Sequence, residues 1–255
     1  MQGEQRPWVI AHRGAPYEAP ENTLAGFEWA IQQGADWIEL DVHQTSDQQL
    51  VVIHDETVDR TTDGTGPVAR KTLRELQTLD AGGWMGARFQ KERIPTLAEV
   101  LALTEGRAGV VIEVKAGSWQ YPGIERRIAG ELRQANRLAD VIIISADRDA
   151  ITTIRQLDSE IATLCFQEKL LAPEIWKLPS EHHIGSLRPT LFLFGDAPDL
   201  DEKIVGQAHR KGIGVLTSLV PEPAVSPEMI ARLVQTGVDG IFTNEPAVLR
   251  SLLSG

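Results

Sequence analysis

Two strand-like segments of the chain carry acidic residues where a buried strand is normally apolar. Within residues 37–42 (WIELDV), alternation puts Glu39 and Asp41 on one face and the apolar side chains on the other. Strands of a parallel barrel are buried on both faces, so two unpaired carboxylates there would repel each other and lose hydration. A hard divalent cation relieves both penalties and prefers carboxylate oxygens. The pattern therefore indicates a metal site; the alternative is an edge strand whose polar face meets solvent.

The same pattern recurs within residues 111–115 (VIEVK). Glu113 and Lys115 share one face of this segment, opposite its apolar residues. Glu113 would supply a third carboxylate, and Lys115 a compact positive charge for a phosphate oxygen. The alternative is a Glu–Lys pair in which the two residues satisfy each other. The repetition on two strands favours a shared site for a metal ion and an anion.

A histidine is placed near these acids by a predicted hairpin. Residues 46–49 (SDQQ) separate two apolar runs, and this connection is too short for a parallel crossover, so the strands are antiparallel. If Thr45 faces Leu50, continuing the ladder sets Asp41 opposite His54. A histidine beside a metal-bound carboxylate is a candidate general acid or base. The alternative is a histidine with a purely structural role.

Further polar residues follow the first predicted strand. His12 is a second acid–base candidate, Arg13 could clamp a phosphate through two parallel hydrogen bonds, and Gly14 permits a tight exit from the strand. Glu21 and Asn22 precede a predicted helix, whose N-terminus favours an anion. For these two the alternatives are a partner of the helix dipole and a simple N-cap.

The order of elements indicates what positions these residues. Strand-like and helical patterns alternate throughout, which predicts an α/β fold of the (β/α)8 TIM-barrel type, and 255 residues is close to the roughly 250 typical of it. The predicted strands are 8–12, 37–42, 110–115, 141–145, 161–166, one between 182 and 194, 214–219 and 239–243, with 50–55 as the hairpin arm. The predicted helices are 23–33, 123–136, 149–157, 201–211, 227–235 and 247–253. We predict one domain, 1–255, in which 56–93 forms a small insertion lobe at the barrel mouth.

Composition limits the partners. A net charge of −11 disfavours nucleic acid and anionic lipid surfaces. No apolar run approaches the ~18 residues that span a membrane, so stable membrane insertion is not expected. A single cysteine, Cys165, and polar first residues predict a cytoplasmic protein. The oligomeric state is not predicted.

Taken together, the motifs resemble the glycerophosphodiester phosphodiesterase family, in its cytosolic bacterial form. The resemblance rests on five motifs in order: His12-Arg13-Gly14, Pro20-Glu21-Asn22-Thr23, Glu39-Leu40-Asp41-Val42, His54-Asp55 and Glu113-Val114-Lys115. It implies an α/β barrel with an insertion after the second strand and one divalent cation, Mg or Ca. The reaction it implies releases an alcohol and sn-glycerol 3-phosphate from a small-molecule glycerophosphodiester. The implied roles are metal ligands for Glu39, Asp41 and Glu113, acid–base catalysis for His12 and His54, and phosphate contacts for Arg13 and Lys115.

Two segments depart from the family pattern. Residues 216–219 (LTSL) stand where the family usually has Trp-Thr-Val-Asn, and 243–246 (TNEP) where it has Thr-Asp-x-Pro. We expect both departures to touch the organic end of the substrate. Three points stay open: which histidine is the acid, whether the nucleophile is water or the 2-hydroxyl of the substrate, and which alcohol leaves.

Two alternative functions are compatible with these motifs. One is a lysophospholipase D or a phosphosphingolipid-cleaving enzyme on the same barrel, which would need a wide apolar mouth. The other is a non-catalytic barrel that binds phosphate or metal. The presence of both His12 and His54 argues against the second alternative.

Overall fold

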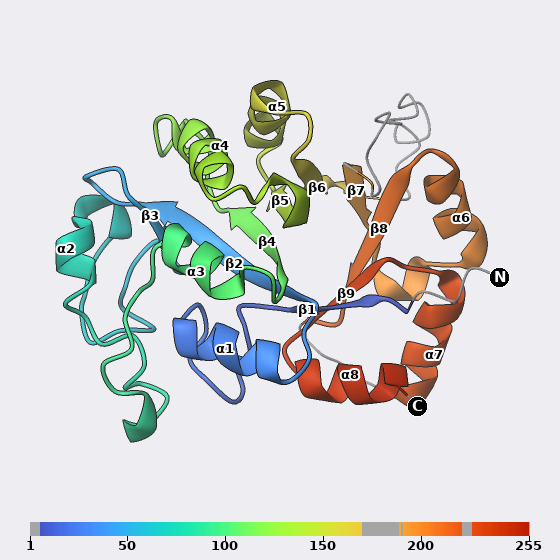
Figure 1. The fold of residues 1–255 in the computed structure, drawn as a ribbon, viewed down its shortest axis with the longest axis horizontal. Helices are drawn as coiled ribbons and strands as arrows, with labels where there is room; N and C mark the ends of the chain where they lie inside the picture. The colour runs from blue at the N-terminus through green and yellow to red at the C-terminus, as the bar shows by residue number, and fades with distance from the viewer. Residues whose placement is uncertain (1–5, 170–188, 190, 221–225, 255) are drawn as a thin grey trace.

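A closed barrel of parallel strands forms the body of the protein (Figure 1). The computed structural model describes residues 6–169, 189, 191–220 and 226–254. The sheet order is β1-β9-β8-β7-β6-β5-β4-β2-β3, and a further β1–β2 pairing closes the barrel. Its strands are β1 (Trp8–Ala11), β2 (Trp37–Gln44), β3 (Leu50–Val52), β4 (Gly109–Val114), β5 (Val141–Ser145), β6 (Ala162–Lys169), β7 (Leu191–Phe194), β8 (Ile213–Ser218) and β9 (Gly240–Thr243). The predicted (β/α)8 fold is confirmed.

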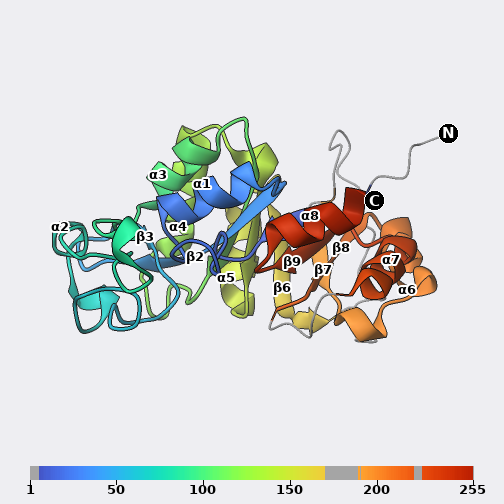
Figure 2. The same cartoon turned by 90° about the horizontal axis from the view of Figure 1, so that it is seen from below.

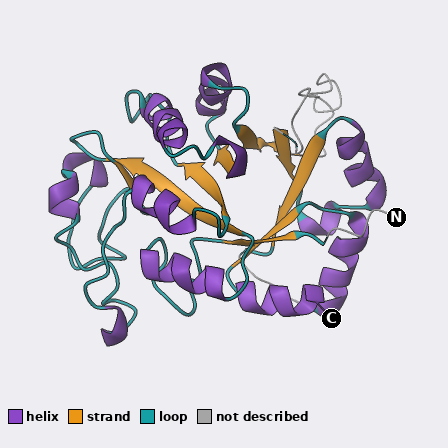
Figure 3. Ribbon diagram, viewed as in Figure 1, coloured by secondary structure: helices purple, strands orange, loops and turns teal. Residues whose placement is uncertain are grey.

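Helices surround the strands, which Figure 3 draws in orange inside a purple outer layer. They are α1 (Leu24–Gln32), α2 (Leu73–Leu76), α3 (Leu97–Thr104), α4 (Ile124–Gln134), α5 (Arg148–Leu157), α6 (Glu202–Arg210), α7 (Pro227–Thr236) and α8 (Pro246–Ser254). Short 3-10 turns occupy Val68–Arg70, Ala87–Phe89, Leu138–Asp140 and Ala197–Asp199. None of the helices in the described part of the chain has the length and apolar character needed to cross a membrane.

Most predicted elements agree with the structure to within a few residues. The strand expected between 182 and 194 is β7, at the end of that span; residues 182–188 and 190 lie outside the described residues. Helix α3 was not predicted. Its signal was a capping box, in which Thr96 and Glu99 bond reciprocally to each other's backbone N–H groups.

Strand alternation separates the barrel interior from the layer beneath the helices. The interior cluster includes Ile10, Trp37, Val111, Ile142, Leu164, Phe192, Leu216 and Phe242. Ile38, Leu40 and Val42 of β2 instead pack outward, in the cluster shared with the helices. Glu39 and Asp41 have the same parity as Trp37, so their side chains point into the barrel.

The predicted hairpin register was wrong by one residue. Gln44 pairs with Leu50, and the Ile53 N–H donates to the Asp41 carbonyl at 3.0 Å, so His54 does not face Asp41 in the ladder. The turn is one residue shorter than predicted, because the Thr45 N–H donates to the Gln49 carbonyl at 3.0 Å and only residues 46–48 remain between these two. A one-residue shift reverses which face a strand residue occupies. The position of His54 is therefore decided by contacts beyond the strand.

The 56–93 insertion folds into a lobe at one end of the molecule (Figure 2). An apolar cluster joins Val58, Val68, Leu76 and Ala81 of the lobe to the flanking residues Val51, Ile53 and Ile94. Two arginines of the lobe contact the loop that joins β1 to α1. Arg88 Nη2 donates to the Glu18 carbonyl at 2.6 Å, and Arg60 Nη1 donates to Glu21 Oε2 at 2.7 Å. The lobe is thus tied to the loop that follows the first barrel strand.

A partly buried carboxyl on α4 predicts a pH-dependent stability. Glu131 lines a groove of about 380 Å³ beside α3, and its Oε2 has no hydrogen-bond partner among the described residues. Burial raises its pKa to about 7. Between the ordinary carboxyl pKa and about 7 the folded protein keeps a proton that the unfolded chain releases, so the free energy of unfolding falls as pH rises through this window.

Glu131→Gln should remove this dependence. From about pH 5 to about pH 8, wild type should lose on the order of 1 kcal/mol relative to the variant, because partial exposure screens the charge. Urea unfolding at several pH values measures the difference. Glu105→Gln, at an exposed position of the same groove, is the control. Parallel stability–pH curves for wild type and Glu131→Gln would contradict the assignment.

Candidate active site

The three predicted metal ligands converge inside the barrel mouth. Asp41 on β2 is in register with Glu113 on β4, so their side chains are neighbours on adjacent parallel strands. Glu39 is two residues earlier on the same inward face. One carboxylate oxygen from each of the three lies within 4.8 Å of the others. Glu39 and Asp41 are buried, and Glu113 is partly exposed at the opening.

The electrostatics of this trio suit a cation. Burial, then repulsion from Asp41 and Glu113, raises the pKa of Glu39 well above its usual value. The pKa of Glu113 is raised by burial and by Asp41. Asp41 Oδ1 is buried with no hydrogen-bond donor among the described residues. Three hard oxygen ligands, one of them without a donor, fit the ligand chemistry of Mg or Ca.

Two basic residues flank the acids. Lys115 Nζ lies 3.0 Å from Glu113 Oε1 and 3.3 Å from Asp41 Oδ1, and Arg13 Nε lies 3.4 Å from Asp41 Oδ2. Burial raises the pKa of Asp41, but Lys115 and Arg13 outweigh it and hold that pKa below its usual value. Burial likewise lowers the pKa of Lys115, but Asp41 and Glu113 raise it to a net increase. Lys115 therefore stays charged beside the carboxylates.

Arg13 is held in an unusual backbone conformation. Its φ is +54° and that of Gly14 is +93°, so the chain turns sharply as it leaves β1. In this turn the Arg13 N–H donates to Glu39 Oε2 at 2.9 Å. A side chain at Gly14 would place its Cβ 2.9 Å from the Gly26 backbone of α1. The turn that aims Arg13 therefore depends on a glycine, as the sequence indicated.

His12 is oriented by a neutral amide. It follows β1, and its Nδ1 lies 2.8 Å from Asn244 Oδ1, just after β9. With the amide oxygen as acceptor, Nδ1 carries the proton and Nε2 is free to accept one. Burial, then Arg13, lowers the pKa of His12. Asn244 belongs to a segment that departs from the family pattern, and it contacts a predicted catalytic group.

His54 is oriented by a carboxylate. Its Nδ1 lies 2.7 Å from Asp55 Oδ1. Its carbonyl oxygen accepts from His43 Nε2 at 3.0 Å, and His43 Nδ1 accepts from the Tyr121 hydroxyl at 2.7 Å. Neither His43 nor the Tyr121 hydroxyl was predicted to support a histidine of the site. The available signal was that His43 continues the inward polar face of Glu39 and Asp41.

Asn22 hydrogen-bonds a predicted metal ligand, Asp41, instead of capping α1. Its Nδ2 donates to Asp41 Oδ2 at 2.7 Å, and its Oδ1 accepts from the Asp41 N–H at 3.3 Å. Thr23 is the N-cap of α1, accepting from the Gly26 N–H, so the prediction of Asn22 as the cap was wrong. Asn22 adopts φ +55°, a conformation that asparagine tolerates better than most residues.

A cavity of about 210 Å³ lies beside the carboxylates. His12, Glu39 and Glu113 line its polar side. Its other lining residues are Ile144, Phe166, Phe194, Ser218, Val220 and Phe242. Phe166 and Phe194 meet edge to face, with ring centroids 5.7 Å apart. The cavity thus joins a charged wall to an apolar one, as a small amphiphilic ligand requires.

The fold and the site define the protein class as an α/β-barrel hydrolase acting on a phosphate ester. Residues 12–248 match the model of the glycerophosphoryl diester phosphodiesterase family. A glycerophosphodiester phosphodiesterase of Caldanaerobacter subterraneus subsp. tengcongensis is 40% identical over 247 residues, covering 96% of this chain and 97% of that protein. One from Bacillus subtilis is 31% identical, covering 97% of this chain and 86% of the relative.

Solved structures agree with these relatives. An Oleispira antarctica phosphodiesterase in complex with the product sn-glycerol-3-phosphate has a TM-score of 0.81 at 29% identity, covering 98% of both chains. A glycerophosphodiester phosphodiesterase from Agrobacterium tumefaciens has a TM-score of 0.79 at 28% identity, covering 96% of this chain and 99% of that one. The chain belongs to the glycerophosphoryl diester phosphodiesterase family. The predictions of this family and of a phosphodiester-hydrolysing enzyme are confirmed.

Neutralising one carboxylate should separate two effects of the trio on stability: the repulsion among its charges and the stabilisation that comes from binding a metal ion. Glu39→Gln keeps the side-chain shape and an oxygen for the Arg13 N–H, but removes a buried charge. In excess chelator the variant should melt at or above the wild-type temperature, because repulsion within the trio is relieved. At a hundredfold excess over Kd, added Mg or Ca should stabilise wild type by about 2.7 kcal/mol and so raise its melting temperature. The melting temperature of the variant should rise far less.

Differential scanning fluorimetry measures both effects. Glu105→Gln, an exposed change outside the trio, should respond to the cation as wild type does. An equal thermal response of wild type and Glu39→Gln to both cations would exclude the trio as the metal site.

Proposed function

We propose that this protein hydrolyses glycerophosphodiesters to sn-glycerol 3-phosphate and an alcohol, with one divalent cation, Mg or Ca, on Glu39, Asp41 and Glu113. The observation that carries the proposal is the convergence of these carboxylates beside His12, within 4.8 Å of one another. The product complex of the Oleispira antarctica relative supports the choice of substrate class. A cation at this position would act as a Lewis acid on a phosphoryl oxygen.

Arg13 and Lys115 bind the phosphate in this proposal. The N–H at Arg13 Nε is buried without a hydrogen-bond partner among the described residues, although it lies near Asp41. A guanidinium can offer paired donors to two phosphate oxygens, and the Lys115 ammonium adds a point charge. Both groups neutralise the charge that builds on the phosphoryl oxygens as the ester bond breaks.

The partners of the two histidines support different roles. His12 is bonded to a neutral amide and lies beside Arg13, and its lowered pKa keeps Nε2 unprotonated near neutral pH. It therefore acts as the general base that takes the proton from the nucleophile. His54 is bonded to the Asp55 carboxylate, which suits the residue that gives a proton to the leaving alcohol. Water and the substrate's 2-hydroxyl are both nucleophiles that this base could serve.

The size of the cavity favours a small substrate. About 210 Å³ beside His12 accommodates a glycerol and a small alcohol rather than an acyl chain, which supports glycerophosphodiesters over lysophospholipids. We also retain as proposals a single domain over residues 1–255 and action in the cytoplasm. Cys165 is the single cysteine and cannot form an intramolecular disulfide, which supports the second of these.

Two substrates and a chelator test this function. Glycerophosphocholine should release choline and glycerol 3-phosphate, and lysophosphatidylcholine should be cleaved far more slowly. Excess chelator should abolish turnover, and Mg or Ca should restore it. A colorimetric assay of released choline measures the turnover of both substrates, with and without chelator. Preference for lysophosphatidylcholine would favour a lysophospholipase D, and phosphate-ester binding without turnover of either substrate would favour a non-catalytic barrel.

A leaving-group series tests the two histidine roles. His12→Ala and His54→Ala should each lower kcat by about 10²–10⁴-fold on glycerophosphocholine while still binding the cation. On an ester of p-nitrophenol, which leaves without protonation, the loss in His54→Ala should shrink while that in His12→Ala persists. The reverse pattern would exchange the roles, and wild-type turnover by both variants would exclude acid–base catalysis by these histidines.

A further inference from the structure

Arg60 of the insertion lobe binds two carboxylates that belong to two different loops of the site. Arg60 Nε and Nη2 donate to Asp55 at 2.7 and 3.0 Å. Its Nη1 and Nη2 also donate to Glu21 at 2.7 and 2.8 Å. Asp55 and Glu21 lie in different loops, one after β3 and the other between β1 and α1. One guanidinium therefore fixes the distance between these loops.

Each carboxylate in turn contacts a residue of the proposed mechanism. Asp55 Oδ1 lies 2.7 Å from Nδ1 of His54, and Glu21 Oε1 accepts from Arg13 Nη1 at 3.3 Å. The result is a continuous chain of paired groups, His54–Asp55–Arg60–Glu21–Arg13, around the mouth of the barrel. Hydrogen bonds from Arg60 hold the pKa of Asp55 below its usual range. The acceptor for the His54 ring therefore stays ionised.

Resting on the proposed roles of His54 and Arg13, we propose that Arg60 is a positioning residue that aligns both from the insertion lobe. Its planar fork is required, because a single point charge cannot bond two carboxylates in this geometry. The ladder between β2 and β3 ends before His54, so no strand pairing determines the orientation of that ring. Arg60, acting through Asp55, supplies the missing constraint. Through Glu21 it also limits the freedom of the Arg13 guanidinium.

The contact through Asp55 and the contact through Glu21 predict different kinetic effects, the first on kcat and the second on KM. Partners that orient a functional histidine are typically worth 10–100-fold. Arg60→Gln should therefore lower kcat by about 10–100-fold through His54, and raise KM for glycerophosphocholine several-fold through Arg13. Arg60→Lys should lie between wild type and Arg60→Gln, since it keeps the charge without the fork. Melting temperatures show that each variant is folded.

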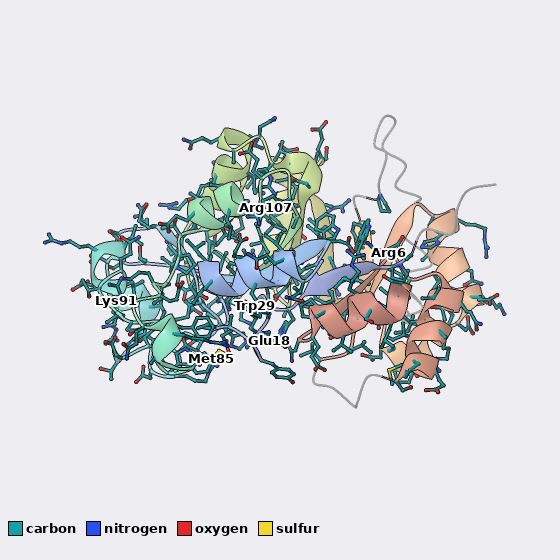
Figure 4. The ribbon with its side chains drawn as sticks, turned by 60° about the horizontal axis from the view of Figure 1, so that its bottom comes forward. Arg6, Glu18, Trp29, Met85, Lys91 and Arg107 are labelled. Carbon is teal, nitrogen blue, oxygen red and sulfur yellow. The ribbon has the colours of Figure 1, made fainter. Side chains whose placement is uncertain are left out.

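Two arginines provide matched controls. Arg88 docks the same lobe on the same loop, through the Glu18 carbonyl, without contacting Asp55 or Glu21. Arg107 makes a comparable two-bond pair with Glu28, at 2.7 and 2.8 Å. In Figure 4 Arg107 is labelled above Trp29, away from Lys91 and Met85 of the lobe. Arg88→Gln and Arg107→Gln should keep kcat and KM within about twofold of wild type.

A double-mutant cycle identifies the route of the effect. In a His54→Ala background, Arg60→Gln should lower kcat no further, while its effect on KM persists. The proposal would be overturned if Arg60→Gln lowered kcat equally with and without His54. It would also be overturned if Arg60→Gln had wild-type kinetics, or if Arg88→Gln showed the same losses. Failure of the proposed function would give a different result, because His54→Ala and Arg13→Lys would then hydrolyse the substrate at the wild-type rate. In that case the positioning role fails with it.

Discussion

Mutual repulsion among Glu39, Asp41 and Glu113 inside the barrel is the constraint on which the rest of the site depends. Parallel strands bring Asp41 and Glu113 into register, and burial removes most of the water that would screen them. Such an arrangement is tolerable only when positive charge is close. Arg13 and Lys115 supply part of that charge. Burial and repulsion from Asp41 and Glu113 still raise the pKa of Glu39, and the proposed cation would complete the charge balance.

The same acids explain why polar groups from distant loops gather at the barrel mouth. A buried carboxylate needs donors for its oxygens, and Asn22 and the Arg13 backbone provide them from the β1–α1 loop. To make those contacts, two residues of this loop other than glycine, Arg13 and Asn22, adopt a positive φ. Both residues lie in the loop that faces the acids, and backbone strain is common where a site dictates local geometry.

The two histidines differ because the barrel gives them different supports. His12 lies where β1 and β9 end side by side, and its partner is an amide from the neighbouring strand end. His54 lies beyond a short hairpin strand and is held by its own neighbour Asp55 and by His43 from β2. A rigid strand end needs one bond to orient a ring. His54, beyond the ladder, has two such contacts, and the Asp55 carboxylate is in turn held by Arg60 of the insertion lobe.

Strand periodicity by itself determined the fold and the membership of the charged trio. Side chains alternate with a period of two, so Glu39 and Asp41 had to share a face, and parallel strands necessarily bring their polar ends to one mouth. The sequence did not determine the partners of the histidines. Asn244 and His12 are 232 residues apart, and no local pattern relates them. The hairpin register depended on a turn one residue shorter than predicted, which shifted the position of His54 relative to Asp41. Periodicity is a local property of the backbone, whereas these contacts exist only because the barrel closes and brings remote strand ends and loops together.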